Sequence, residues 1–99
     1  MSFEDVIRRQ LDLFVEESAD LIAACEDAER AYDAAGRDEA EEKYGDYLDL
    51  VETGTERLAE LRDNFASAMD EAAAEQYEHE FNHAVQVRLS RFALGIENA

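Results

Sequence analysis

The residues with the clearest chemical potential are two histidines and the glutamate that lies between them, His79, Glu80 and His83. Neutral imidazoles are common ligands of transition-metal ions, and a carboxylate can act as a general base. On a helix, residues four apart lie on the same face, so the two imidazoles would lie one turn apart. This spacing indicates a candidate metal site with His79 and His83 as its ligands.

Residues 79–83 read H-E-x-x-H, and in this they resemble the metal-binding helix of the zincin metallopeptidases. The resemblance implies zinc held by His79 and His83, with Glu80 as general base. Catalytic zinc needs a third protein ligand, but the chain has only 2 histidines. No strand-forming segment is present to align a peptide substrate. We therefore expect both histidines to be exposed and the protein not to be an enzyme.

Glu80 and His83 also have the Glu-x-x-His spacing of di-iron carboxylate bundles. Such a site needs a second copy of the motif, which only a symmetric oligomer could supply here. Cys25 lies among small apolar residues without a local cation, so we interpret it as a core residue and not a nucleophile. We predict no cofactor, and a metal-binding bundle stays an alternative.

The most extensive pattern is a row of acidic residues in the middle of the chain, called here the acidic row. Its members recur at spacings of three and four, and Thr53 occupies the one gap. They are Glu39, Glu42, Asp46, Asp49, Glu56, Glu60 and Asp63. A helix places such residues on one face, where each like-charged pair costs a few tenths of a kcal/mol. A row that is kept despite this cost favours a cationic partner or a salty environment.

Three explanations of the row remain open: a solvated face that gives solubility, adaptation to molar salt, and mimicry of a polyanion. The chain has one Lys and eight Arg, and this scarcity of lysine is compatible with adaptation to molar salt. In size and composition the chain is similar to anti-CRISPR proteins and DNA mimics, and that similarity implies an inhibitor of a nucleic-acid-binding protein. We predict binding to a basic protein surface through the following residues. They are Glu42, Asp46, Asp49, Glu56, Glu60 and Asp63.

A net charge of -17 argues against nucleic acid or an anionic membrane as direct partners, since phosphate recognition needs Lys and Arg. A single cysteine fits a reducing cytoplasm. The sequence contains no run of 18 apolar residues, so it predicts no membrane span. Glu4 and Asp5 are acidic where a signal peptide would be basic. We therefore expect a cytoplasmic protein.

Helices must position all of these residues, because the chain has no proline and is rich in helix formers. Apolar residues recur every three or four positions, which predicts helices over 2–36, 38–68 and 70–95. Short turns between long helices favour an antiparallel three-helix bundle, one domain over residues 1–99. A break at Gly54 would make four helices, but the apolar pattern keeps its phase there and favours one continuous helix.

The last predicted helix differs in charge from the rest of the chain. Residues 81–96 contain no acid and include Arg88 and Arg91. Val87 and Leu94 lie off the apolar face that would meet the core. Either this helix is deeply buried, or these four residues form a self-association surface, since surplus apolar surface rarely stays exposed. A homodimer is therefore an alternative that the sequence leaves open.

Overall fold

The structure is a computed structural model that describes residues 2–99. Its regular elements are all helical, in this order along the chain. They are α1 (Glu4–Glu17), α2 (Ala19–Ala34), α3 (Ala40–Ala66), α4 (Glu71–Arg88), the 3-10 helix η1 (Ser90–Phe92) and α5 (Ala93–Asn98). The all-α prediction is confirmed. No helix within residues 2–99 is both long enough and apolar enough to cross a membrane.

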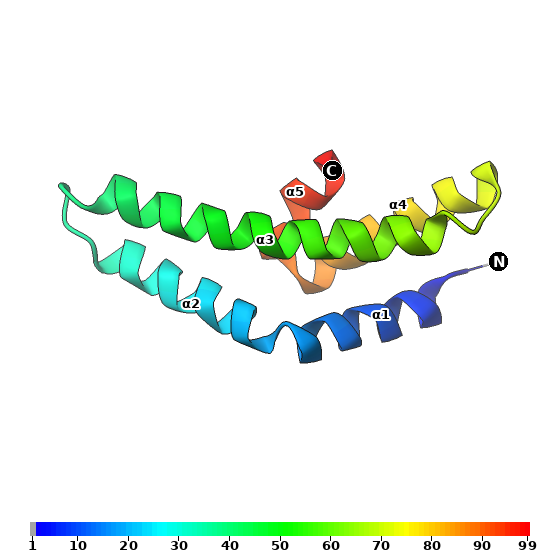
Figure 1. Cartoon of the computed structure of the whole chain (residues 1–99), viewed down its shortest axis with the longest axis horizontal. Helices are drawn as coiled ribbons and strands as arrows, with labels where there is room; N and C mark the ends of the chain where they lie inside the picture. The colour runs from blue at the N-terminus through cyan, green and yellow to red at the C-terminus, as the bar shows by residue number, and fades with distance from the viewer. Residues whose placement is uncertain (1) are drawn as a thin grey trace.

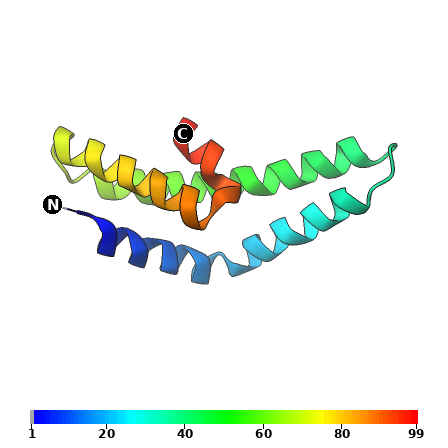
Figure 2. The same ribbon diagram turned by 180° about the vertical axis from the view of Figure 1, so that it is seen from behind.

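The longest helix, α3, runs along nearly the whole molecule, which measures 51 × 24 × 19 Å (Figure 1). α2 packs along its first half, whereas α4, η1 and α5 pack on its second half (Figure 2). α1 precedes α2 in the chain and contacts α4. The end formed by α2 and the start of α3 therefore has two layers of helices, and the opposite end has more. Neither the antiparallel bundle nor the expected count of three or four helices is confirmed, because the described residues form five α-helices and two of the predicted helices are interrupted.

The first interruption is at Ser18, inside the helix predicted over 2–36. Ser18 has φ -108° and ψ 21°, outside the helical region, and separates α1 from α2. Its backbone N–H still donates to the Phe14 carbonyl, at 2.8 Å, and its own carbonyl accepts from Ile22 N–H at 3.0 Å. The side chain is buried, and its hydroxyl accepts a hydrogen bond from Arg57 Nη1 at 3.3 Å. The bend lets α2 follow α3 while α1 turns toward α4.

The prediction of a continuous helix through Gly54 is confirmed by α3. Gly54 is buried, and a Cβ atom built on it would lie 2.4 Å from Cε1 and 2.8 Å from Cζ of Phe92. Phe92 in η1 is 1% exposed and makes an edge-to-face contact with Phe14, with ring centroids 5.9 Å apart. Glycine is therefore needed here for close approach of an aromatic ring, and not for flexibility of the helix.

The second interruption divides the helix predicted over 70–95. Its start agrees with the prediction, because the Asp70 side chain caps α4 by accepting from Ala73 N–H at 2.9 Å. α4 ends at Arg88, and Leu89 leaves the helical region with φ -128° and ψ 55°. The chain then turns back through η1 and α5, which places Phe92 and Ile96 on α3.

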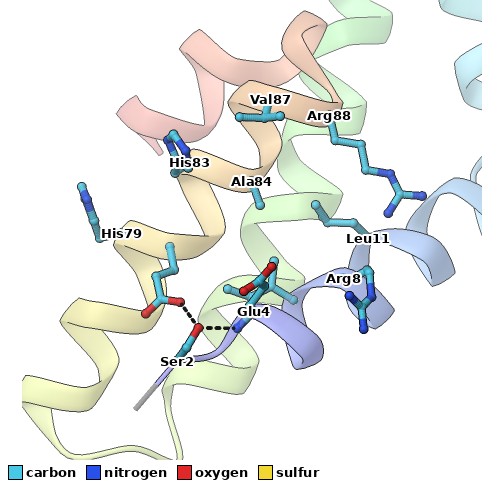
Figure 3. A pocket seen from close by; sticks show the side chains of 11 residues that line it. Ser2, Glu4, Arg8, Leu11, His79, His83, Ala84, Val87 and Arg88 are labelled. Atoms are coloured by element: carbon cyan, nitrogen blue, oxygen red, sulfur yellow. Dashed lines mark hydrogen bonds between the residues drawn. The ribbon is translucent and has the colours of Figure 1, made fainter.

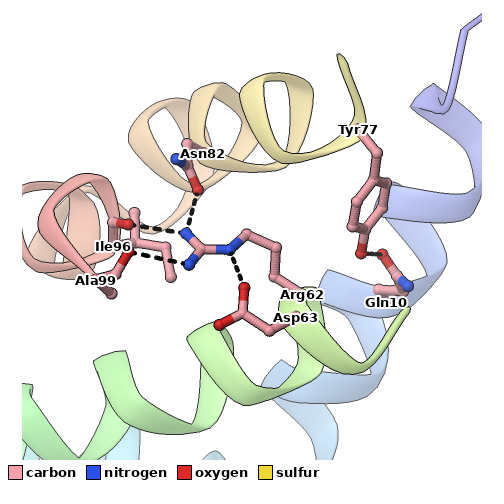
Figure 4. A network of polar contacts seen from close by, with 7 residues as sticks. All are labelled: Gln10, Arg62, Asp63, Tyr77, Asn82, Ile96 and Ala99. Atoms are coloured by element: carbon pink, nitrogen blue, oxygen red, sulfur yellow. Dashed lines mark hydrogen bonds and ion pairs between the residues drawn. The ribbon is translucent and has the colours of Figure 1, made fainter. Parts of the chain in front are cut away.

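The core contains one charged side chain that helical periodicity did not predict. Arg62 is 4% exposed and lies between α3, α4 and α5 (Figure 4). Its Nη1 donates to Asn82 Oδ1 and to the Ile96 carbonyl, both at 2.9 Å, and its Nη2 donates to the Ala99 carbonyl at 3.2 Å. Its Nε pairs with Asp63 at 2.9 Å. A buried cation is tolerated when it is paired and hydrogen-bonded, as here.

Candidate functional site

The acidic row lies on α3 and its immediate N-terminal neighbour, and every member is exposed to solvent. The helix continues without interruption from Ala40 to Ala66, so no kink scatters the carboxylates. The exposed members are Glu39, Glu42, Asp46, Asp49, Glu56, Glu60 and Asp63. A rise of about 1.5 Å per residue puts successive carboxylates about 5 Å apart along the helix axis. The structure thus presents the six predicted partner-binding residues on one rigid element.

The molecule itself neutralises little of this row. Among residues 2–99, its one ion pair is that of Asp63 with Arg62. At the gap in the row, the Thr53 hydroxyl donates to the Asp49 backbone carbonyl at 3.1 Å, so Thr53 is occupied by its own helix. Glu52 is exposed and lies between Asp49 and Glu56 at the same three-and-four spacing. Sequence reasoning missed Glu52, although its spacing was there to be read.

The acidic surface extends beyond α3, because the two-layered end of the molecule is acidic on both helices. We call residues 26–52 the arm; it holds eleven acids and three basic residues. One basic residue, Arg30, pairs with Asp27 on the same helix. Tyr32 and Tyr44 meet across the arm with ring centroids 5.2 Å apart, and both stay partly open to solvent. The arm therefore combines negative charge with exposed tyrosine rings.

The histidine motif lies on α4, where its glutamate has a structural partner. Glu80 Oε1 accepts a hydrogen bond from Phe3 N at 3.1 Å, just before the start of α1. It also accepts one from Ser2 Oγ at 3.3 Å (Figure 3). Oε2 accepts from Gln76 Nε2 at 2.9 Å. The hydrogen bond from Gln76, then that from Phe3, lowers the pKa of the Glu80 carboxyl. Glu80 is therefore a carboxylate that holds the start of α1 against α4, a different task from general base.

His79 and His83 project from α4 and are among the residues that line an open groove between α4 and α1, to which Arg8 and Leu11 contribute from α1 (Figure 3). Both are exposed, and no hydrogen bond or ion pair engages either ring within the described chain. Among residues 2–99, no group of three or more His, Cys, Asp or Glu side chains is arranged to hold a metal ion. Within the described part of the chain, a single copy thus places two imidazoles on one helix without a third ligand.

An open groove of about 670 Å³ runs between α1 and α4. Its apolar wall includes Ile7, Leu11 and Ala84, and Arg8 and Arg88 stand at its edge (Figure 3). Both cations already have acidic partners on α1: Arg8 pairs with Asp5 at 2.9 Å and Arg88 with Asp12 at 2.7 Å. The groove was not predicted, because it exists only where two segments distant in sequence meet.

The four residues predicted to mediate self-association fall into two groups. Val87 and Leu94 are 73% and 80% exposed, the largest exposed fractions among the large apolar side chains of residues 2–99. Arg91 instead turns toward the arm, where its Nη2 pairs with Glu29 at 3.3 Å and its Nε donates to Tyr47 at 3.2 Å. Together with the pairing of Arg88, this leaves Val87 and Leu94 as the open part of that surface.

Two further titratable groups are in the core. Cys25 is fully buried, and burial raises the pKa of its thiol, which disfavours the reactive thiolate. Tyr77 is also fully buried, and its hydroxyl donates to Gln10 Oε1 at 2.8 Å. Burial raises the pKa of Tyr77 to about 12. Both residues serve packing, as the sequence indicated for Cys25.

Comparison with known proteins finds no protein family, curated protein or solved structure that matches this chain. The geometry of its own residues is therefore the basis on which its function can be inferred.

Proposed function

We propose that this chain is a non-catalytic binding protein that uses the acidic row on α3 to occupy a basic surface of a partner protein. The observation that supports this proposal is the straight, uninterrupted α3 with exposed carboxylates along it, of which only Asp63 has an ion-pair partner within residues 2–99. A partner's Arg and Lys side chains could approach these groups without first displacing internal ones. The partner we favour is one whose basic surface ordinarily binds nucleic acid.

The spacing of the charges supports the nucleic-acid-mimic form of the proposal. Carboxylates about 5 Å apart on a helix are of the same order as phosphates along a strand. A surface built to accept a row of phosphates would therefore meet a row of similar pitch. Exposed charges of this kind steer association and raise its rate more than they raise the final affinity. Binding should accordingly be fast and strongly weakened by salt.

The competing explanation is that the row serves solubility alone. Under that explanation any three exposed acids would be equivalent, because only the net charge matters. Under our proposal, the positions of the acids within the row matter.

We further propose that the protein acts in the cytoplasm, where the buried, unpaired Cys25 would remain reduced.

A matched pair of triple variants separates these explanations. The first replaces Asp46→Asn, Asp49→Asn and Glu56→Gln in the row. The second replaces Glu16→Gln, Glu17→Gln and Glu75→Gln, exposed acids outside α3 that also have no ion pair in the described chain. Both change the net charge by the same amount. Each protein is immobilised, partners are captured from extract of the native host, and association rates with the captured partner are measured at several salt concentrations.

We expect the row variant to associate several-fold more slowly at low salt and with a weaker salt dependence, while the control behaves as wild type. Added duplex DNA or RNA should compete with the chain for the partner. Unfolding cannot explain such a loss, since removing like charges from α3 should stabilise the helix by a few tenths of a kcal/mol per pair. Equal binding by both variants would disprove docking through the row and leave solubility as its role.

A further inference from the structure

The two histidines on α4 are exposed and lie four residues apart. We propose that His79 and His83 from two copies hold one Zn²⁺ ion at a two-fold interface between antiparallel α4 helices. This site is separate from the acidic row and does not depend on the function proposed for it.

The chemistry and spacing of the two histidines suit a shared metal ion. Cβ atoms four residues apart on a helix are about 5–6 Å apart on the same face, a spacing that lets two imidazoles reach one ion. Both rings are exposed and unengaged, so neither must give up an internal bond. Zn²⁺ in structural sites is almost always tetrahedral with four protein ligands. Within residues 2–99, one copy supplies two imidazoles and no group of three potential ligands, whereas two copies supply four imidazoles.

The position of the two histidines along α4 suits a two-fold arrangement of two helices. The midpoint between His79 and His83 is at residue 81, close to the middle of α4 (Glu71–Arg88). Two α4 helices related by a two-fold axis at that level would overlap along most of their length. A two-fold interface is self-complementary, so His79 of one copy would lie near His83 of the other. All four rings would then surround the axis.

A net charge of -17 strongly limits where the molecule can meet its own copy. α4 is polarised: Glu71, Glu75, Glu78 and Glu80 all lie within residues 71–80, whereas residues 81–88 have no acid and end at Arg88. Antiparallel pairing sets the acid-free half of one helix against the acidic half of its copy. The charge of Zn²⁺ would offset the remaining repulsion.

Exposed apolar surface lies next to the two histidines on α4. Val87 lies one turn beyond His83, continues the same stripe, and is 73% exposed. α4 lies in front of α3 in Figure 2, with no other helix covering it there. Surplus apolar surface beside a pair of unengaged ligands indicates an interface that a second copy covers.

The test uses the full chain and zinc as the probe. Sedimentation velocity is measured in EDTA and after addition of Zn²⁺, and the bound zinc is counted by titration calorimetry. We expect a monomer in EDTA and a dimer with one Zn²⁺ per two chains, reversed by EDTA. Co²⁺ in place of Zn²⁺ should give the visible absorption of tetrahedral coordination.

The control is a variant that keeps two histidines but changes their spacing, His83→Ala with Gln86→His. Its rings would start about 10 Å apart along the helix, too far to share one ion. Because all carboxylates are retained, non-specific zinc binding by acids would be unchanged. We expect this variant to stay monomeric in zinc with an unchanged circular dichroism spectrum and melting temperature.

Several results would overturn the proposal: one Zn²⁺ bound per monomer, no zinc binding, or zinc-dependent dimerisation that survives the change of spacing. A dimer that persists in EDTA would equally show that the interface does not depend on metal. A second variant, Val87→Asp, tests the packing of the interface and leaves the ligands intact. It should lower the zinc-dependent dimer fraction without abolishing zinc binding, and an unchanged dimer fraction would rule out the antiparallel α4 arrangement.

Discussion

The contact between Gly54 and Phe92 makes one sharp prediction about stability. Gly54→Ala would add a Cβ 2.4 Å from Phe92 Cε1, well inside van der Waals contact. The ring cannot move away easily, because it is 1% exposed and packs edge-to-face on Phe14. Overpacking of this kind costs about 1–3 kcal/mol, and the better helix propensity of Ala returns about 1 kcal/mol. We expect net destabilisation of up to about 2 kcal/mol.

Gly45→Ala is the matched control in the same helix. A Cβ at Gly45 meets no atom within 4 Å, so only the gain in helix propensity remains, about 0.5–1 kcal/mol. The same chemical change should therefore have opposite signs at two positions of α3. Since 1 kcal/mol shifts the Tm of a domain this size by about 4–8 °C, the two variants should melt on opposite sides of wild type.

Urea unfolding followed by circular dichroism gives both free energies of unfolding. A coupling test adds Phe92→Leu, which shortens the side chain that faces Gly54. In that background, Gly54→Ala should cost less by at least about 0.5 kcal/mol, the lower limit for residues in contact. If Gly54→Ala were as stabilising as Gly45→Ala, the packing of η1 on α3 would have to be rejected.

Two further predictions concern buried polar side chains. Burial raises the pKa of Tyr77 from 10.0 to about 12, so as the pH rises the Tyr77 hydroxyl ionises in the unfolded chain before it does in the folded one. The contribution of Tyr77 to the free energy of unfolding is therefore fully present below pH 10 and is lost as the pH rises toward 12. That loss is roughly 2–3 kcal/mol, and Tyr77→Phe should show a correspondingly shallower decline in urea unfolding free energy across this range; an identical decline would contradict the assignment. Arg62→Met would remove the donor of Asn82 Oδ1 and leave the Ile96 carbonyl with only the longer bond from Ala99 N–H, at 3.4 Å, and should cost about 1–3 kcal/mol. Hydrogen exchange should then quicken in α5 and not in α2, and uniform quickening would argue against a local role for Arg62.

The sequence by itself was sufficient for every property that depends on neighbours within a turn or two. Helical composition and three-and-four periodicity predicted an all-α chain, the continuity of α3 through Gly54 and the exposure of the acidic row. The start of α4 could be predicted because Asp70 caps the helix that directly follows it. Such features are local, so their physical causes can be read from adjacent residues.

Only the tertiary structure decided where the helices are interrupted and which charged group is buried. The apolar pattern runs through both Ser18 and Leu89 without a change of phase, yet both leave the helical region. The turn at Leu89 brings Phe92 onto Gly54, a contact between residues far apart in the chain. Arg62 is buried because the chain that follows that turn supplies backbone carbonyls to its guanidinium. Periodicity records which face of a helix is apolar, but the free energy gained by bending depends on partners that only the folded chain brings together.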